Sequence, residues 1–227
     1  MLTVSSVITD DILSQGGIPA VRVQISVPCF TGGSRVSTGR INRFYRHLAE
    51  KYRADIRRKV LPVAAKTMEA MESPETFVPF SVTVEYTVTD LTEDLLSLYL
   101  DITEKAGGSR GVVSRRADTW SVLSGLPVSL EELFDKRVNV KKECLRLIDE
   151  QISDALSNKT CEYFTNYRKL IRRRFDKESF FVKDGEVLIF YGQDVIAPRY
   201  EGFPLFPVCR LFRGCSTGET AEEARKP

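Results

Sequence analysis

The strongest constraint on the fold is a strict two-residue alternation that recurs in two separate stretches of the chain. Apolar side chains alternate with polar ones over Ala20–Val27 and again over Phe80–Val88, the pattern of half-buried strands. Between them, apolar residues recur every three or four positions from Ile41 to Met71, which predicts one long helix over about 42–71. Pro62 falls inside this helix and should kink or split it. The chain should therefore hold a sheet with a helix packed on one face.

The sequence after residue 90 again predicts both strands and helices. A glycine turn at Gly107–Gly108 joins predicted strands over 95–103 and 112–123, which favours an antiparallel hairpin. Ser129 with Glu132 matches a capping box, so a short helix over 130–134 and a longer one over 139–157 should follow. The remaining predicted segments are a strand over 2–8, a basic stretch of unassigned structure over 168–176, a hairpin over 180–182 and 187–191, and a last strand over 203–212.

The expected fold class is α+β, with mostly antiparallel sheet or sheets packed by a long N-terminal helix and a second helix in the C-terminal half. We expect residues 1–212 to form one unit and residues 213–227 to form a flexible, polar tail. Hydrophobic residues make up 42% of the 227 positions, enough for a substantial core.

Charge and apolar patterning limit the function classes. The net charge is only +2, so the molecule as a whole lacks the strong positive charge that would attract polyanions. No apolar run reaches the roughly 18 residues of a membrane span, and the first residues do not read as a signal peptide. The chain as written is expected in the cytoplasm, or outside it if a leader is missing. Five irregularly spaced cysteines favour free thiols; the alternative is one or two disulfides, such as Cys209 with Cys215.

Candidate catalytic groups do not assemble into a convincing set. The single histidine, His47, lies among basic neighbours on the long helix and reads as a surface residue. Gly214–Gly218 matches the G-x-S-x-G pattern, but no histidine follows it. Acid pairs that could serve a glycan hydrolase are Glu131 with Glu132 and Asp176 with Glu178. We expect structural roles for them, and no catalytic, cofactor-binding or metal-ligating residue.

A basic run is the strongest charge feature. Arginines and lysines occupy most positions from 168 to 174, with aromatic residues interleaved from 163 to 175. Arginine binds phosphate and aromatic rings can stack on bases, so a surface shared with the basic side of the long helix would bind polyanions. The alternative is a solvated helix face whose arginine stems cover apolar surface, and nucleic acid is not the expected partner.

Short motifs in a fixed order resemble one bacterial family. Leu95-Leu96-Ser97, Gly107-Gly108 and Leu130-Glu131-Glu132-Leu133-Phe134 resemble its middle stretch. Its end is matched by Phe180-Phe181-Val182-Lys183-Asp184-Gly185, then Ile196-Ala197-Pro198 and Gly202. The family is the domain of unknown function that forms the extracytoplasmic, lysozyme-binding region of the anti-sigma factor RsiV. It also accompanies peptidoglycan deacetylases.

The resemblance covers about residues 20–212 and implies two halves. Residues 18–90 resemble the companion domain that usually precedes the family, and residues 91–212 resemble the RsiV C-terminal region. Family members usually have Ala-His after the two glycines, where this chain has Ser109-Arg110, and an aromatic residue where it has Asp194. The resemblance implies an α/β fold with antiparallel sheet and binding rather than catalysis.

The leading functional hypothesis is a non-catalytic recognition module for a protein or cell-wall ligand. Loops on a rigid sheet carry most recognition, so the expected contact loops are those of Gly107, Gly108 and Arg110 and of Arg199 and Tyr200. The alternatives are a carboxylate-based glycan hydrolase and a binder of nucleic acid or another polyanion. Nothing in the sequence specifies an oligomeric state.

Overall fold

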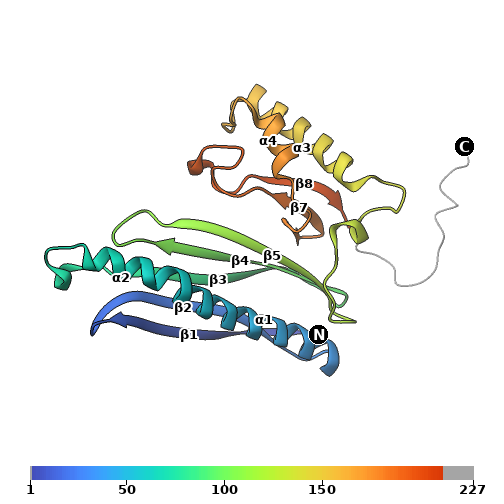
Figure 1. Ribbon diagram of the computed structural model, residues 1–227. Coiled ribbons are helices and arrows are strands. Elements are labelled where there is room, and N and C mark those ends of the chain that lie inside the picture. Colours follow the sequence, from blue (N-terminus) through green and yellow to red (C-terminus); the bar gives the residue numbers. More distant parts are fainter. Residues whose placement is uncertain (1, 212–227) are drawn as a thin grey trace, which may run out of the picture.

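A computed structural model describes residues 2–211, which form two β-sheets with helices on their outer sides (Figure 1). The first sheet has five strands in chain order: β1 (Thr3–Gln15), β2 (Ile18–Thr31), β3 (Phe80–Leu91), β4 (Leu95–Lys105) and β5 (Val112–Ser121). The second sheet has three: β6 (Phe180–Lys183), β7 (Glu186–Phe190) and β8 (Leu205–Arg210).

Four α-helices and several short turns complete the fold. The helices are α1 (Arg35–Asp55), α2 (Leu61–Glu69), α3 (Val140–Ser157) and α4 (Tyr167–Arg174). A π-helical turn, Ile56–Val60, joins α1 to α2, so the three run as one continuous rod. Short 3₁₀ turns occupy Pro74–Thr76, Leu130–Leu133 and Arg199–Glu201.

Neighbouring strands are antiparallel except for β2 and β3. These two pair in parallel, with Val23 opposite Val82 and Ile25 opposite Val84. Parallel strands need a long crossover, and the rod α1–α2 supplies it. Strands β1 and β2 are joined instead by Gly16-Gly17, whose φ angles of 57° and 83° suit the tight turn of a hairpin.

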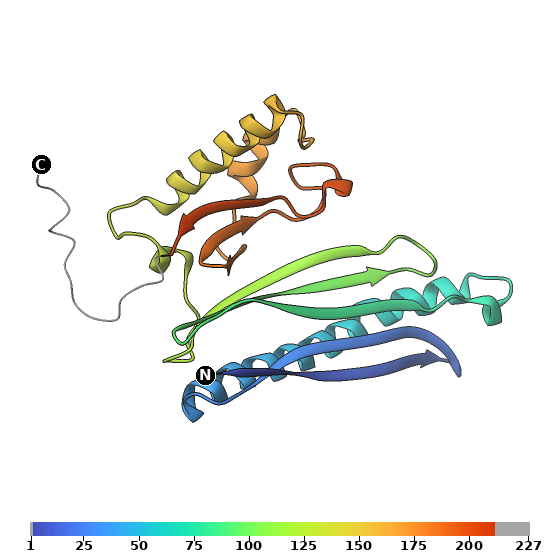
Figure 2. The ribbon, with the colours of Figure 1, turned by 180° about the vertical axis from the view of Figure 1, so that it is seen from behind.

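The alternation predicted from the sequence sets the layers of the molecule. Apolar residues of β2, including Val21 and Ile25, are fully buried in a core with Ile41 and Tyr45 of α1. On the opposite face, β3, β4 and β5 are covered by the second sheet, which carries α3 and α4 on its outer side (Figures 1 and 2). The order of layers is therefore rod, first sheet, second sheet and helix pair.

Buried polar contacts join the two sheets. The backbone N–H of Val182 in β6 donates to the Ser97 hydroxyl at 2.8 Å, and its carbonyl accepts from the Thr89 hydroxyl at 2.6 Å. The Gly185 N–H donates to Asp90 at 2.9 Å. Because both backbone groups of Val182 are satisfied, β6 can be buried against a sheet to which it is not paired as a strand.

The structure confirms the predicted fold class and refines several boundaries. The long helix is only partly matched, because it begins at Arg35, passes through a π-turn and ends at Glu69. The first strand runs on to Gln15, and the unassigned basic segment is helix α4. The predicted tail and Gly214–Gly218 lie outside the described residues.

The buried residues form two cores, which divide between Val122 and Leu130. This packing groups the β4–β5 hairpin with the residues before it; the division near residue 90 that the resemblance implies stays a prediction. Within residues 2–211, no helix is both long and apolar enough to cross a membrane.

Candidate functional site

The main candidate site is a groove between the helical rod and the exposed part of the first sheet. Two adjoining hollows of about 440 Å³ and 420 Å³ make it up, and they share Lys59, Val60, Val82 and Glu104. We call their combined lining the helix–sheet groove. It exists because the rod lies over β2, so the same face of β4 and β5 is left partly open beside it (Figure 1).

Proline chemistry explains why the rod carries a π-turn at this groove. Pro62 cannot donate a backbone hydrogen bond, and its ring would crowd the carbonyl four residues earlier in a regular helix. The N–H of Leu61 instead donates to the carbonyl of Ile56, five residues back. The widened turn places Ile56, Lys59 and Val60 along the groove. Such π-turns are frequent at functional sites.

The floor of the groove is apolar. Ile56 and Val82 are buried there, and Val60, Phe80 and Ile102 are partly buried. Val63 and Val112 continue this surface outward and are 56% and 62% exposed. A partner that covered them would gain the free energy of removing apolar surface from water.

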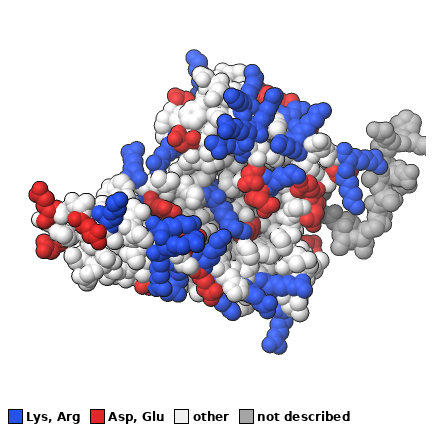
Figure 3. Space-filling model, viewed as in Figure 1, with Lys and Arg blue, Asp and Glu red and all other residues white. Residues whose placement is uncertain are grey.

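Charged side chains border the apolar floor. The helical rod contributes Lys51, Asp55 and Lys59, and the β4–β5 loop contributes Arg110. The strands contribute Glu104, Lys105, Arg115 and Arg116. Basic groups thus outnumber acidic ones around the groove. In Figure 3, Lys and Arg side chains gather over the middle of the rod, in the same view as a second basic group near α4.

Asp55 is engaged by neighbouring cations of the rod. Its carboxylate lies 2.7 Å from Arg58 and 3.5 Å from Lys59. Desolvation acts to raise the pKa of Asp55, but Lys59 and Arg58 outweigh it and hold the pKa below its ordinary value. Asp55 is therefore suited to an ion pair and not to the proton-donating role of a catalytic acid.

A buried hydrogen-bonded network lies beside the groove. The indole N–H of Trp120 donates to the Tyr45 hydroxyl at 2.9 Å, which in turn donates to Asp118 at 3.4 Å. Arg116 donates to the same carboxylate at 2.8 Å. Burial and the charge of Asp118 raise the pKa of Tyr45 well above its usual value, so Tyr45 stays a neutral phenol. The network ties α1 to β5 and supplies no activated base.

The predicted contact loops meet at one end of the first sheet. Arg110, beyond Gly107 and Gly108 in the β4–β5 turn, lines the groove. The guanidinium of Arg199 donates to the carbonyl of Gly111, at the end of the same turn. Tyr200 is 73% exposed, and its hydroxyl donates to Glu162 instead. The structure thus joins Arg199 to the β4–β5 loop, and contact with a ligand stays a prediction.

Arg115 is a residue that the sequence analysis missed. It is among the residues that line the groove, and its guanidinium lies 3.8 Å from the ring centre of Tyr99 and 4.3 Å from that of Phe203. It also donates two hydrogen bonds to Asp101, at 2.7 and 2.8 Å. The arrangement fastens the loop before β8 to the first sheet. These residues come together only through the pairing of the strands, so their spacing in the sequence does not predict the contact.

The basic helix α4 does not share a surface with the basic side of the rod. The rod and α4 lie on opposite sides of the first sheet, so the coplanar basic surface considered from the sequence does not form. Tyr167 is buried, and Tyr163 packs against it and Phe206. These rings are therefore not free to stack on bases.

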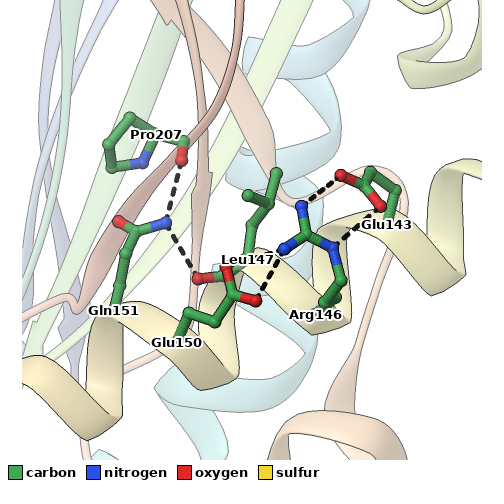
Figure 4. A network of polar contacts seen from close by, with 6 residues as sticks. All are labelled: Glu143, Arg146, Leu147, Glu150, Gln151 and Pro207. Atoms are coloured by element: carbon green, nitrogen blue, oxygen red, sulfur yellow. Dashed lines mark hydrogen bonds and ion pairs between the residues drawn. The ribbon is translucent and has the colours of Figure 1, made fainter.

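Acidic side chains offset the charge on the side of α4 that faces α3. A hollow of about 440 Å³ between the two helices is lined by both signs of charge. Arg146 pairs with Glu143 and Glu150, and Gln151 donates to the backbone of Leu147 and of Pro207 in β8 (Figure 4). Arg168 pairs with Asp149 at 2.9 Å. These contacts hold α3 in place and leave Lys169, Arg172 and Arg173 as the outer basic face.

The acid pairs considered from the sequence have structural partners. Glu131 pairs with Lys177, and hydrogen bonding from that lysine lowers the pKa of Glu131. Glu132 accepts from the hydroxyl and the backbone N–H of Ser129, which lowers its pKa and completes the predicted capping box. Asp176 accepts from the backbone of Glu178. The lowered pKa values of Glu131 and Glu132 suit ionised groups at a helix start and do not suit a general acid.

The remaining reactive residue types stand apart from the groove. His47 is exposed and contacts Glu50 at 3.2 Å, which confirms the predicted surface position. Cys29, Cys144, Cys161 and Cys209 are free thiols; burial raises the pKa of Cys144 to about 12. Cys215 and its predicted alternative pairing lie outside the described residues. Within residues 2–211, no three His, Cys, Asp or Glu side chains cluster as metal ligands.

Comparison with known proteins shows the fold. No family model matches the chain, and no curated protein does. Among solved structures, a DUF3298 family member from Bacteroides fragilis NCTC 9343 aligns with a TM-score of 0.62 at 13% identity, covering 91% of this chain and 90% of that one. A DUF3298 family protein from Pseudomonas aeruginosa PAO1 aligns with a TM-score of 0.58 at 16% identity, covering 92% and 90%. The chain therefore has, over most of its length, the fold of these proteins of unknown function.

Proposed function

We propose that the chain is a non-catalytic recognition module that binds a segment of another protein in the helix–sheet groove. The observation that carries the proposal is the composition of the groove: an apolar floor within a mainly basic border. Protein interfaces have this layout, with an apolar centre and a polar rim. The surplus of basic groups favours a partner segment that carries acidic residues beside its apolar ones.

The chemistry of the groove supports binding over glycan hydrolysis. A glycoside hydrolase needs two carboxyl groups flanking its substrate, one of them with a raised pKa. Asp55 and Glu104 are the two carboxylates that line the groove, and the pKa of Asp55 is held low by Lys59 and Arg58. Such a carboxylate cannot keep the proton that a leaving group requires.

The resemblance of the sequence motifs to RsiV suggests a first candidate partner. The motif order resembles the lysozyme-binding region of RsiV, so lysozyme belongs among the probes. A second probe is a displayed library of random peptides, which samples acidic and apolar segments without assuming an identity. Peptides that bind through the groove should be enriched in acidic residues next to apolar ones.

Matched variants test whether binding uses the groove. We expect Val63→Asp and Arg110→Glu to weaken the bound probe at least tenfold, because they place a charge on the apolar floor and reverse the border. Arg199→Glu tests the adjoining loop. The controls are Val36→Asp and Arg43→Glu, exposed positions on α1 outside the groove. Equal affinity of all these variants for every selected probe would refute the site assignment.

A further inference from the structure

Strand β1 forms an edge of the first sheet, and its charged residues, Asp10 and Asp11, and its one irregularity all lie in its second half. It pairs with β2 on one side, and Figures 1 and 2 both show it along the outer border of the sheet. It is 13 residues long and contains no Lys, Arg or Pro. Its pairing with β2 is regular up to a single irregularity between Leu13 and Ser14. Long edges of this kind expose a row of backbone groups that can pair with another strand.

The opposite edge of the same sheet is protected. Strand β5 is shorter and carries two adjacent arginines, Arg115 and Arg116. Its final residues are covered by the chain itself, since the N–H of Ser121 donates to Leu126 and the carbonyl of Thr119 accepts from Val128. The contrast shows that β1 is the more open of the two edges.

Apolar side chains on β1 are exposed at regular spacing. Val4, Ile8 and Ile12 are 42%, 60% and 59% exposed. They lie four residues apart, so they project from the same face of the strand, opposite to Asp11, which pairs with Arg53 and Arg57 of the rod. Three aligned, uncovered aliphatic side chains beside an open backbone edge form a surface suited to a second strand.

We propose that β1 pairs antiparallel with β1 of a second copy of the chain, about a two-fold axis at Ile8. In such a pair Ile8 faces its own counterpart, and Val4 faces Ile12 of the other copy. Asp10 then lies opposite Ser6, so no acidic residue opposes another. Cross-strand aliphatic pairs stabilise a sheet and like charges destabilise it.

Other symmetric registers are less favourable. Residues that oppose each other must share a face of the sheet, so the axis has to fall on a residue. An axis at Thr9 would place Ile8 against Asp10, and an axis at Asp10 would set the two Asp10 carboxylates against each other. The register centred on Ile8 pairs all three exposed aliphatic residues of the outer face, which is the isologous arrangement of a two-fold dimer.

The dimer would merge two five-stranded sheets into one continuous sheet. Each helix–sheet groove borders β4 and β5, toward the other edge of its own sheet, and so stays open. A two-fold axis perpendicular to the sheet keeps both rods on the same side. The proposal does not depend on what the groove binds, although two grooves on one side would raise the affinity for a repeated partner.

Sedimentation equilibrium of the full chain tests the association. The wild-type chain should sediment with twice its monomer mass, and Ile8→Lys should weaken dimerisation at least tenfold. Val112→Lys, at an exposed valine on the opposite edge strand, should dimerise like the wild type. A wild-type monomer at every concentration would refute the proposal, as would an Ile8→Lys variant that dimerises normally.

Cysteine cross-linking tests the register. Under mild oxidation Ile8→Cys should form a disulfide with its counterpart, because opposed Cβ atoms lie about 5 Å apart. Asp10→Cys should not, since its counterpart is displaced along the strand by four residues, about 13 Å. The wild-type chain, with its natural cysteines, is the control. Equal cross-linking of the Ile8→Cys and Asp10→Cys variants would exclude the register centred on Ile8.

Discussion

The stacked arginine between the sheets gives the sharpest stability prediction. The Arg115 side chain is only 10% exposed, while its partner Asp101 is 27% exposed. Replacing Arg115 with Met keeps an apolar stem between Tyr99 and Phe203 but removes both hydrogen bonds to the carboxylate. The substitution therefore measures the contribution of the charge and its hydrogen bonds, while most of the side-chain packing is kept.

The expected cost follows from these exposures. Breaking a fully buried ion pair costs about 3–5 kcal/mol, because a charge is left uncompensated. Water can reach the Asp101 carboxylate, which lowers this cost to about 2 kcal/mol, and the lost cation–π contacts add about 1 kcal/mol. We therefore expect Arg115→Met to lower the free energy of unfolding by about 3 kcal/mol.

Urea denaturation, followed by the fluorescence of Trp120 in the first core, measures this free energy. The double variant Arg115→Met with Asp101→Leu should recover more than half of the loss, since an apolar pair can replace a buried ion pair. Arg22→Met, at an exposed position of β2, is the control. A stability of Arg115→Met within about 0.5 kcal/mol of the wild type would refute the reasoning, as would a double variant that is no more stable than the single one.

Three further predictions concern single residues. Gly125→Ala should destabilise the chain by about 3 kcal/mol, because the φ of Gly125 is 67° and an added Cβ would lie 2.5 Å from the backbone of α1. The control is Gly16→Ala, which is also at positive φ but in open space. It should cost about 1 kcal/mol in the same denaturation assay. Ser97→Ala should cost about 2 kcal/mol and speed hydrogen exchange at the Val182 amide, which loses its acceptor. The depressed pKa of Glu132 means that its stabilising effect is present above the unfolded pKa of about 4.3 and lost as the pH falls through the lower folded value. Glu132→Gln should therefore be less stable than the wild type at pH 7 and equally stable near pH 2 in thermal melts.

The strands and helices were largely predictable because their apolar periods are local. The alternation of Val21, Val23 and Ile25 locates β2, and the same reasoning locates β3. The end of β1 was missed because Asp10 and Asp11 have low strand propensity, whereas pairing with β2 and the ion pairs from Arg53 and Arg57 hold the strand in place. Helix α4 was missed because only Tyr167, Leu170 and Ile171 are apolar, among five charged residues.

The groove could not be predicted, because it depends on register. Ile56, Val82 and Ile102 share its floor only after β3 pairs with β4 and the rod crosses between β2 and β3. Pro62 was expected to disturb the helix, and it lies at the start of α2 beside the π-turn, but nothing local to it identifies the facing strands. The glycine turn led to Arg110 as an expected contact residue; the structure places it at the groove, and contact with a ligand stays a prediction.

Hydrogen exchange of the chain with and without a bound probe tests the recognition proposal most directly. With lysozyme or a selected acidic–apolar peptide bound, amides of the π-turn Ile56–Val60 and of Val112–Arg116 should exchange more slowly. Amides of helix α4 should be unchanged. Slower exchange confined to α4, with none beside Val60 or Val82, would contradict the assignment of the helix–sheet groove as the binding surface.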